Sequence, residues 1–552
     1  MLTGTYPVEV PMRIAWQLIV AIFLALNAGL IGGVDSRYAG DVCASALQQG
    51  GTLFYGLTLS PSGIDPHVNA SSELGIPLRS VYDTLVYRVA SSPEETAQQF
   101  VPGLAEAWEI SQDGLTYTFH LRRDVKFHDG TPFNAAAVRA NLERIVDPAT
   151  RSQKAVFLLG PFHSVEVVDE YTVAIHLSAP YAPLLDGLSQ VYLGMASPQA
   201  LARWGADYQF HQVGTGPFRL EEYVPNDHLT IVRNDEYAWG PPIHAHQGPA
   251  HLERVVFRFF TDPAGRAIAL QAGDVQVMGE IPPLDAVRLQ QDGGFTIVPV
   301  PIPGQSLGLI LNTQRPPLDD VRVRRALLFA TNREEIVQTI FGGFSPAATG
   351  PLTAATFGHI DLPAEVVRFD PDEAARLLEE AGYVDSDGDG VRDRDGQPLL
   401  LDAVLMTWGS LPEVAQLIQS QWRSIGVQLR TRTLTYPAAL EAARTGDYHL
   451  IPQNYAGGDP DLLYTYYHSS STFNWTRAAD AVLDDLLVRA RQVSDAAARM
   501  ELYAQAQKRI MELVLLIPIR DPVNLNGVST RVQGLRFDAH GWFPILHDVR
   551  LQ

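Results

Sequence analysis

The stretch PEVAQLIQSQWRSIGVQLRT (residues 412–431) joins a helix to a strand through one glycine and so points to the class of fold. Its first part is helical, Gly426 stops the helix, and a strand begins at Val427. The same plan returns in PAALEAARTGDYHLIPQ (437–453), where the strand covers residues 448–453.

A third copy of the plan opens in FDPDEAARLLEEAGY (369–383). Asp370 is the expected N-cap, Pro371 occupies the first helical position, and Gly382 ends the helix. Long helices are expected from residue 480 to about 511, followed by a strand in LVLLIPI. Helices and strands that alternate at this spacing predict an α/β architecture for the second half of the chain.

The first half is richer in strands and turns. LTYTFHL (115–121) alternates apolar and polar residues, which predicts a half-buried strand. His128 and Asp129 follow it; they are either an acid–base pair or part of a tight turn in which Gly130 has positive φ, and we favour the turn. The chain thus reads as a strand-rich half followed by an α/β half. Ligands of such assemblies usually lie between the domains.

Two further segments of the first half have clear local signals. SVEVVDEYTVAIHL (164–177) predicts a hairpin that turns near residues 169–170. NAAAVRANLERIV (134–146) predicts a helix capped by Asn134, with Val138, Leu142 and Ile145 on its apolar face.

Composition limits the partners. The chain has 552 residues, 46% hydrophobic and 19% charged, which is ordinary for a globular protein of several domains. A net charge of −21 argues against nucleic acid and anionic membrane surfaces. The single cysteine, Cys43, rules out a disulfide within the chain.

The beginning of the chain resembles an export signal. Arg13 precedes the apolar run IAWQLIVAIFLAL (14–26), which is short for a membrane span. We therefore expect residues 1–49 to be a signal sequence or an anchor and tether, and the protein to act in the periplasm or at the outer face of the cytoplasmic membrane. Val42 makes Cys43 a poor site for lipid attachment.

Several segments, taken together and in order, resemble one known family. They are LAEAWEISQDGLTYTFHLRRDVKFHDGTPFNAAAV (104–138), VGTGPFRLEEY (213–223), RNDEYAWG (233–240), LNTQRPPLDDVRVRRALLFATNREEIV (311–337), DPDEAARLLEEAGY (370–383) and VLDDLLVRA (482–490). This pattern is similar to the extracellular solute-binding proteins of ABC importers, family 5, the peptide- and nickel-binding type.

The resemblance implies a two-lobed periplasmic-binding-protein type II (clam-shell) fold with an extra inserted α+β domain. Lobe I would comprise residues 50–79, 196–297 and 523–552, the inserted domain 80–195, and lobe III 298–522. The protein would be a monomer that holds a small organic solute or short peptide between the lobes and delivers it to the transmembrane permease subunits. It would need no cofactor and would not be an enzyme.

Ligand-facing positions follow from the resemblance and from aromatic residues near strand ends. Each aromatic also has a simpler explanation as a core residue. The candidates are Ser60, Trp408, Tyr455, Asp459, Phe473, Asn474 and Trp475.

The segment NYAGGDPD (454–461) departs from peptide-binding relatives, which carry an aspartate for the peptide ammonium a few residues before the DP pair. Here Ala456, Gly457 and Gly458 fill that span, although Asp459 could take the role if the loop is shorter. We expect a solute without a free amino terminus, such as an oligosaccharide or another neutral solute, because a buried unpaired ammonium is costly.

The segment DSDGDGVRDRDG (385–396) matches the first half of a calcium-binding loop. Its ligands would be Asp385, Asp387 and Asp389, with the Val391 carbonyl and Asp393. The twelfth position is Gly396 instead of glutamate, so we favour a plain hairpin over a structural calcium site.

His244, His246 and His251 lie close together in a Pro/Gly loop, where a solvated loop is favoured over a zinc or nickel site. Two other functions stay open: a secreted hydrolase that uses an Asp/Glu pair, and a ligand sensor for signalling. No carboxylate pair with a supporting third group stands out in the sequence.

Overall fold

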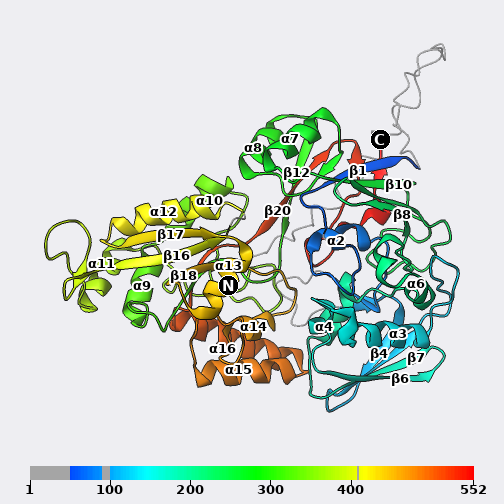
Figure 1. Cartoon of the computed structure of the whole chain (residues 1–552), viewed down its shortest axis with the longest axis horizontal. Coiled ribbons are helices and arrows are strands. Elements are labelled where there is room, and N and C mark those ends of the chain that lie inside the picture. The colour runs from blue at the N-terminus through cyan, green and yellow to red at the C-terminus, as the bar shows by residue number, and fades with distance from the viewer. Residues whose placement is uncertain (1–49, 62, 90–99, 407–408) are drawn as a thin grey trace, which may run out of the picture. The chain divides into compact units, whose positions relative to one another are not determined.

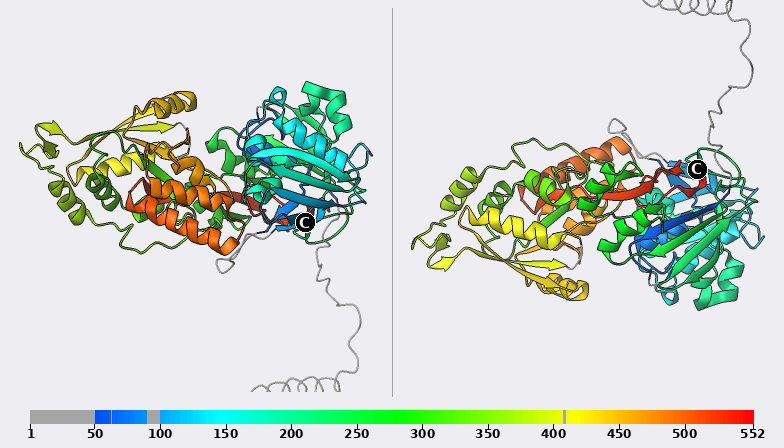
Figure 2. Two further views of the ribbon diagram at one scale, coloured as in Figure 1. Left: turned by 90° about the horizontal axis from the view of Figure 1, so that it is seen from below. Right: turned by 90° about the horizontal axis from the view of Figure 1, so that it is seen from above.

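The computed structural model describes residues 50–61, 63–89, 100–406 and 409–552. All of them belong to one compact unit, Leu47–Gln552. Figures 1 and 2 show its five-stranded sheet on the left and the other two large sheets on the right. The expected signal or anchor segment and Trp408 lie outside the described residues.

A seven-stranded mixed sheet has the order β12-β20-β11-β1-β10-β9-β8. β1 is parallel to β10 and β11, whereas β20 is antiparallel to both β11 and β12. The strands are β1 (Thr52–Leu57), β8 (Phe218–Val224), β9 (His228–Arg233), β10 (Arg254–Phe259), β11 (Val277–Met278), β12 (Phe295–Pro301) and β20 (Val523–Ser529). Helices α7 (Pro263–Ala272) and α8 (Pro283–Gln291) pack on it and share a small core with β11, β12 and β20.

A four-stranded antiparallel sheet follows in the chain, with the order β4-β5-β7-β6. Its strands are β4 (Ala105–Ile110), β5 (Thr116–Leu121), β6 (Phe162–Asp169) and β7 (Thr172–Leu177), and α3 (Ala135–Val146) packs against β6 and β7. Its buried face shares one core with the seven-stranded sheet: Phe119 and Ile175 belong to the same cluster as Leu53 and Phe257. The bounds of the inserted domain, 80–195, stay a prediction.

The five-stranded sheet has the order β17-β16-β18-β13-β19. β16 is parallel to β17 and β18, and β13 is antiparallel to β18 and β19. The strands are β13 (Leu307–Leu311), β16 (Leu400–Met406), β17 (Gln428–Leu434), β18 (Leu450–Gln453) and β19 (Leu516–Arg520). The helices of this part are α9 (Val321–Phe329), α10 (Arg333–Phe341), α11 (Pro371–Glu380), α12 (Leu411–Arg423), α13 (Tyr436–Thr445), α14 (Leu462–Tyr467), α15 (Ala481–Gln492) and α16 (Ala496–Glu512).

Two short segments connect the seven-stranded and five-stranded sheets. The chain passes from β12 to β13 through residues 302–306 and returns from β19 to β20 through residues 521–522. The expected boundary between residues 297 and 298 therefore falls within β12. Ligands of clam-shell proteins are held between two parts that move about such connections.

The shorter elements complete the described chain. They are α2 (Ser72–Leu78), β2 (Val86–Arg88), β3 (Phe100–Pro102), α4 (Ala155–Leu158), α5 (Leu184–Ser189), α6 (Pro198–Trp204), β14 (Asp393–Arg394), β15 (Gln397–Pro398), β21 (Val532–Gln533) and β22 (Arg550–Leu551), with 3₁₀ turns at Pro148–Thr150, Val191–Leu193, Gly205–Phe210 and Leu546–Asp548. In the part of the chain that the structure describes, no helix has both the length and the apolar character that a membrane crossing requires.

Local signals in the sequence are confirmed where capping and periodicity were strongest. Asn134 caps α3 by accepting from the Ala137 N–H, and Asp370 caps α11 by accepting from the Glu373 N–H. The hairpin of β6 and β7 pairs Val165 with Ile175.

The turn after β5 is confirmed as a turn. Asp129 accepts hydrogen bonds from the backbone and hydroxyl of Thr131, and Gly130 has φ +82°. The His128 ring contacts backbone groups of Gly214 and Gly216. The acid–base interpretation of His128 and Asp129 therefore has no support from the hydrogen bonds.

Candidate functional site

The main cavity lies between the seven-stranded and the five-stranded sheet and has a volume of about 770 Å³. That volume lies within the range of organic-ligand sites, roughly 300–1,000 Å³. Residues at the ends of β1, β16, β18 and β19 line it, and both connections contribute, through Ile302 and Pro522. Ligands of α/β sheets commonly bind beyond the carboxyl ends of the strands.

The five-stranded part contributes most of the aromatic wall. Tyr455, just after β18, stacks on Tyr466 with ring centroids 4.2 Å apart. Burial raises the pKa of Tyr455, so its hydroxyl stays protonated at neutral pH. Trp475 and Phe341 add further apolar surface to the same cavity.

A glycine in the first connection holds the Tyr455 segment in place. Gly304 has φ +140°, and a Cβ there would lie 2.0 Å from the Tyr455 carbonyl oxygen. The next residue, Gln305, donates its N–H to that carbonyl at 2.7 Å. Any side chain at Gly304 would therefore push the Tyr455 segment away from the connection.

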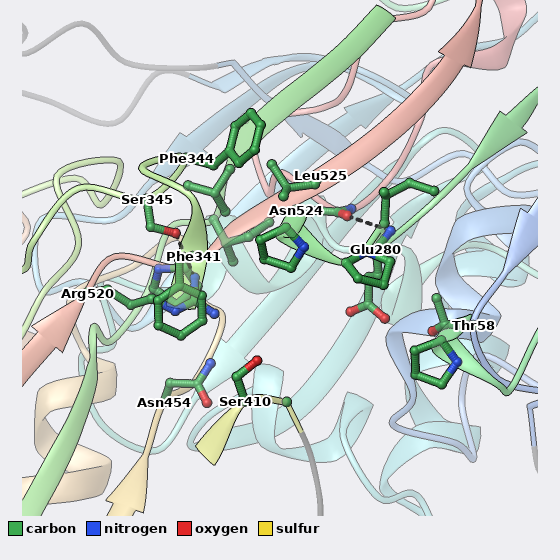
Figure 3. Close-up of a pocket in the computed structure, with 18 of the residues that line it drawn as sticks. Thr58, Glu280, Phe341, Phe344, Ser345, Ser410, Asn454, Arg520, Asn524 and Leu525 are labelled. Carbon is green, nitrogen blue, oxygen red and sulfur yellow. Dashed lines mark hydrogen bonds between the residues drawn. The ribbon is translucent and has the colours of Figure 1, made fainter. Parts of the chain in front are cut away.

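The charged groups on the cavity wall are Arg266 and Glu280 on one side and Arg520 on the other; Figure 3 shows Glu280 and Arg520 across the cavity from each other. Arg266 donates to the Glu280 carbonyl oxygen at 3.0 Å, and its guanidinium lies 4.0 Å from the Glu280 carboxylate. Arg520 donates to the Ser345 hydroxyl at 2.8 Å.

A second carboxylate lies behind the wall. Thr58 lines the cavity and donates its hydroxyl to Glu73 Oε1 at 2.7 Å. Glu73 is 5% exposed, and its other carboxylate oxygen has no hydrogen-bond partner. The pKa of Glu73 is raised to about 7, mainly by burial and in smaller part by the negative charge of Glu280.

Of the residues expected from the sequence, Tyr455 and Trp475 line the cavity. Ser60 follows the lining residues Thr58 and Leu59, and its hydroxyl accepts a hydrogen bond from the Asn226 N–H at 3.1 Å.

The other candidates have contacts of a different kind. Asp459 forms an ion pair with Arg499, with two hydrogen bonds of 2.6 and 2.8 Å. Asn474 is buried and donates to the Ala478 carbonyl at 3.0 Å, while Phe473 is 42% exposed and packs edge-on against Tyr466. A ligand role for these three residues stays a prediction.

The acidic loop, residues 385–396, brings together only some of the calcium ligands expected from the sequence. Carboxylate oxygens of Asp385, Asp387 and Asp389 all lie within 4.8 Å of one another, and all three residues are exposed. Asp393 instead accepts hydrogen bonds from the backbone and hydroxyl of Ser386. The proposed calcium ligands are thus split between two local hydrogen-bond patterns.

The histidines of the Pro/Gly loop meet a fourth histidine from the end of the chain. His547 stacks between His244 and His246, with ring centroids 4.1 and 4.0 Å away. His246, His547 and Asp548 are close enough for one ion. Most ring nitrogens of these three stacked histidines already contact backbone or side-chain groups, as His547 Nε2 does with the Gly248 carbonyl at 2.8 Å.

Sequence reasoning missed Arg266, Glu280, Arg520 and Trp542, which all line the cavity. Only Arg520 had a usable signal: it directly follows the strand LVLLIPI and lies just before residue 522, the expected end of lobe III. The other three come from loops or helices whose place at the cavity depends on the tertiary fold.

Two sheets joined by two short connections around a cavity of this size define the class of two-lobed solute-binding proteins. Residues 99–477 match the family model described as bacterial extracellular solute-binding proteins, family 5 Middle. The chain belongs to this family, as the sequence segments predicted.

Relatives of known name cover most of the chain. A dipeptide-binding protein of Escherichia coli is 29% identical over 92% of this chain and 95% of its own length. A glutathione-binding protein, GsiB, of Salmonella choleraesuis is 32% identical over 75% of this chain and 79% of its own length. The crystal structure of NikA from Brucella suis in complex with Fe(III)-EDTA matches with a TM-score of 0.80 and 26% identity, covering 91% of this chain and 100% of NikA.

Proposed function

We propose that this protein captures a peptide-sized organic solute outside the cytoplasmic membrane and delivers it to the permease of an ABC importer. The observation that carries the proposal is the cavity of about 770 Å³ whose walls come from both sheets. A solute that contacts both walls stabilises the closed form to the extent that it binds the closed form more tightly than the open form. Delivery to a permease rests on family membership.

The wall chemistry suits a solute of mixed polarity. Apolar rings, among them Tyr455, Trp475 and Trp542, surround a few polar groups such as Asn454 and Asn524. Such a wall favours ligands that present flat apolar faces together with a small number of hydrogen-bonding groups. The names of the two relatives, a dipeptide-binding and a glutathione-binding protein, fit a solute of this size.

The hydrolase alternative has less support. Glu280 is the carboxylate on the wall among the lining residues that the structure describes, and Arg266 lies beside it. Glu73, whose pKa is near 7, is buried behind Thr58, and no described acid on the wall is placed to work as its partner on a bound solute. General acid–base catalysis needs groups within hydrogen-bond reach of the reacting atoms.

Binding is tested by calorimetry and thermal shift with dipeptides, glutathione, disaccharides and metal chelates. Trp542 is half-buried on the wall, so Trp542→Ala should weaken the binding of whichever class binds wild type. The control is Trp204→Ala, because Trp204 is also half-buried but stacks on His211 away from the wall. Hydrolysis of a panel member without stable binding would contradict the proposal.

The alternative to a plain hairpin in the acidic loop is a structural calcium site. The carboxylates of Asp385, Asp387 and Asp389 supply oxygen ligands, the type that calcium prefers. Asp387→Ala should then abolish any calcium-dependent rise in melting temperature and leave solute binding unchanged. Equal melting temperatures of the wild type in calcium and in chelator would show that no calcium ion stabilises the fold.

A further inference from the structure

Arg520 is the last residue of β19, at the point where the chain leaves the five-stranded sheet. It lines the cavity, and Figure 3 shows it beside Phe341 and Ser345, across the cavity from Glu280 and Thr58. A charged side chain in this position faces the bound solute from the wall opposite the Glu280 carboxylate.

The contacts of Arg520 leave one edge of its guanidinium unused. Nη1 donates to the Ser345 hydroxyl at 2.8 Å, and the guanidinium carbon lies 4.0 Å from the centre of the Phe341 ring. Nε is shielded from solvent and has no hydrogen-bond partner. Nε and Nη2 together form the edge that binds a carboxylate through two parallel hydrogen bonds.

Among the described residues, Arg520 has no ion-pair partner on the wall. Glu280 lies beside Arg266, and no carboxylate of the described residues comes within 4.0 Å of the Arg520 guanidinium. The adjacent Asp521 accepts the Ala354 N–H at 2.9 Å with one carboxylate oxygen, and its charge raises the pKa of Arg520 and so balances that cation in part. Burial lowers the pKa of Arg520 to about 10, so the side chain is still a cation at neutral pH.

A partly buried cation whose charge is balanced only in part, and whose Nε lacks an acceptor, is stabilised when a ligand of opposite charge supplies that acceptor. We propose that Arg520 anchors a carboxylate of the bound solute, whose two oxygens accept from Nε and Nη2. The inference rests on the proposed function, because it assigns a chemical class to the solute of the same cavity.

On the opposite wall the carboxylate of Glu280 already has the Arg266 guanidinium beside it, at 4.0 Å. The span in which we expected an ammonium-binding aspartate from the family resemblance holds Ala456, Gly457 and Gly458, and the Asp459 carboxylate binds Arg499. The cavity is therefore built for organic acids, including peptides with a blocked amino terminus and acidic sugars. This replaces the neutral solute expected from the sequence, since Arg520 could not be placed at the cavity from the sequence alone.

The test uses matched pairs, each consisting of a free acid and its primary amide. The pairs are N-acetylated dipeptides, unblocked dipeptides and uronic-acid disaccharides, titrated by calorimetry into the full-length wild-type protein. The acid should bind about 10- to 100-fold more tightly than its amide, the factor expected for hydrogen bonds to a charged group.

Two variants assign the preference to Arg520. Arg520→Gln should bring the acid and its amide to similar affinity. Arg520→Lys should keep part of the preference for the acid, because lysine keeps the charge but cannot donate two parallel hydrogen bonds from a planar group. The control is Arg368→Gln: Arg368 also lies over a phenylalanine ring, Phe329, at 4.5 Å, but does not line the cavity, so the acid preference should be unchanged.

The outcomes separate the anchor from the proposed function. Equal binding of acids and amides by the wild type, or a preference that survives Arg520→Gln, overturns the anchor and leaves solute binding standing. A panel in which neither acids nor amides bind overturns the proposed solute class and the anchor together. Circular dichroism of each variant shows that a loss of preference reflects a folded protein.

Discussion

Replacing Asp459 by asparagine tests whether this carboxylate stabilises the fold or holds the solute. Asp459 and Arg499 are 6% and 5% exposed, and they share two hydrogen bonds of 2.6 and 2.8 Å. Burial acts to lower the Arg499 pKa, but the Asp459 carboxylate, together with Tyr503 and Asp461, outweighs burial and raises that pKa. Asp459 is thus the carboxylate that pairs directly with Arg499.

Asp459→Asn leaves the Arg499 charge buried without its carboxylate. Breaking a buried pair in this way destabilises a protein by about 3–5 kcal/mol. Residues 47–552 form one compact unit, whose unfolding entropy is about 1 kcal/mol/K at roughly 2.1 cal/mol/K per residue, so that loss lowers the melting temperature by about 3–5 °C. Affinity for the acid that binds best in the acid–amide panel should stay within about twofold, because the bonds of Asp459 go to Arg499 and not to the cavity.

The measurement pairs thermal unfolding with calorimetry, and the control is Asp485→Asn. Asp485 forms a surface pair with Arg489 at 3.1 Å, with side chains 61% and 57% exposed, so its loss should change stability by less than about 1 kcal/mol. An Asp459→Asn protein that melts like the wild type but loses binding of unblocked dipeptides would refute this reasoning and make Asp459 the ammonium anchor.

Two further predictions concern pH and closure. His67 is fully buried between the Gly194 carbonyl and Arg144, and burial lowers its pKa from 6.5 to about 4. Between pH 6.5 and 4 the unfolded chain binds a proton at this histidine and the folded chain does not, so the free energy of unfolding falls by about 3 kcal/mol as the pH falls through that window. In denaturant titrations, His67→Gln should lack this pH-dependent loss of stability. The same pH dependence of the free energy of unfolding in wild type and variant would contradict the prediction. A Cβ at Gly458 would lie 1.4 Å from Arg88 Nη1, so Gly458→Ala should displace the Arg88 side chain. If the contact between Arg88 and Gly458 favours the closed form, solute affinity measured by calorimetry should fall several-fold. Unchanged affinity would show that this contact does not contribute to binding.

The parts of the fold that the sequence predicted are those with local causes. Asp370, Pro371 and Gly382 bound α11 because the cap, the first-turn proline and the positive φ of the glycine act within a few residues. The first connection was harder to place. β12 continues to Pro301 because Val523 of β20 pairs with it, and such a distant partner leaves no local signal.

The site was predicted only in part for the same reason. Tyr455 was chosen because its segment follows a strand and Trp475 because it belongs to an aromatic cluster, and both line the cavity. Asp459 was ambiguous because its partner, Arg499, lies 40 residues away in the sequence. Arg520 has its unused edge only because Ser345, 175 residues away, binds the other side of the guanidinium.

The central claim is that one organic solute occupies the cavity between the two sheets. Native mass spectrometry of the full-length protein, mixed with the best-binding acid of the panel, measures this directly. The account predicts one solute per chain in the wild type and in Trp204→Ala, and a large loss of the bound form in Trp542→Ala. Retention of the solute by Trp542→Ala at wild-type level, or several solutes bound without discrimination, would contradict the claim.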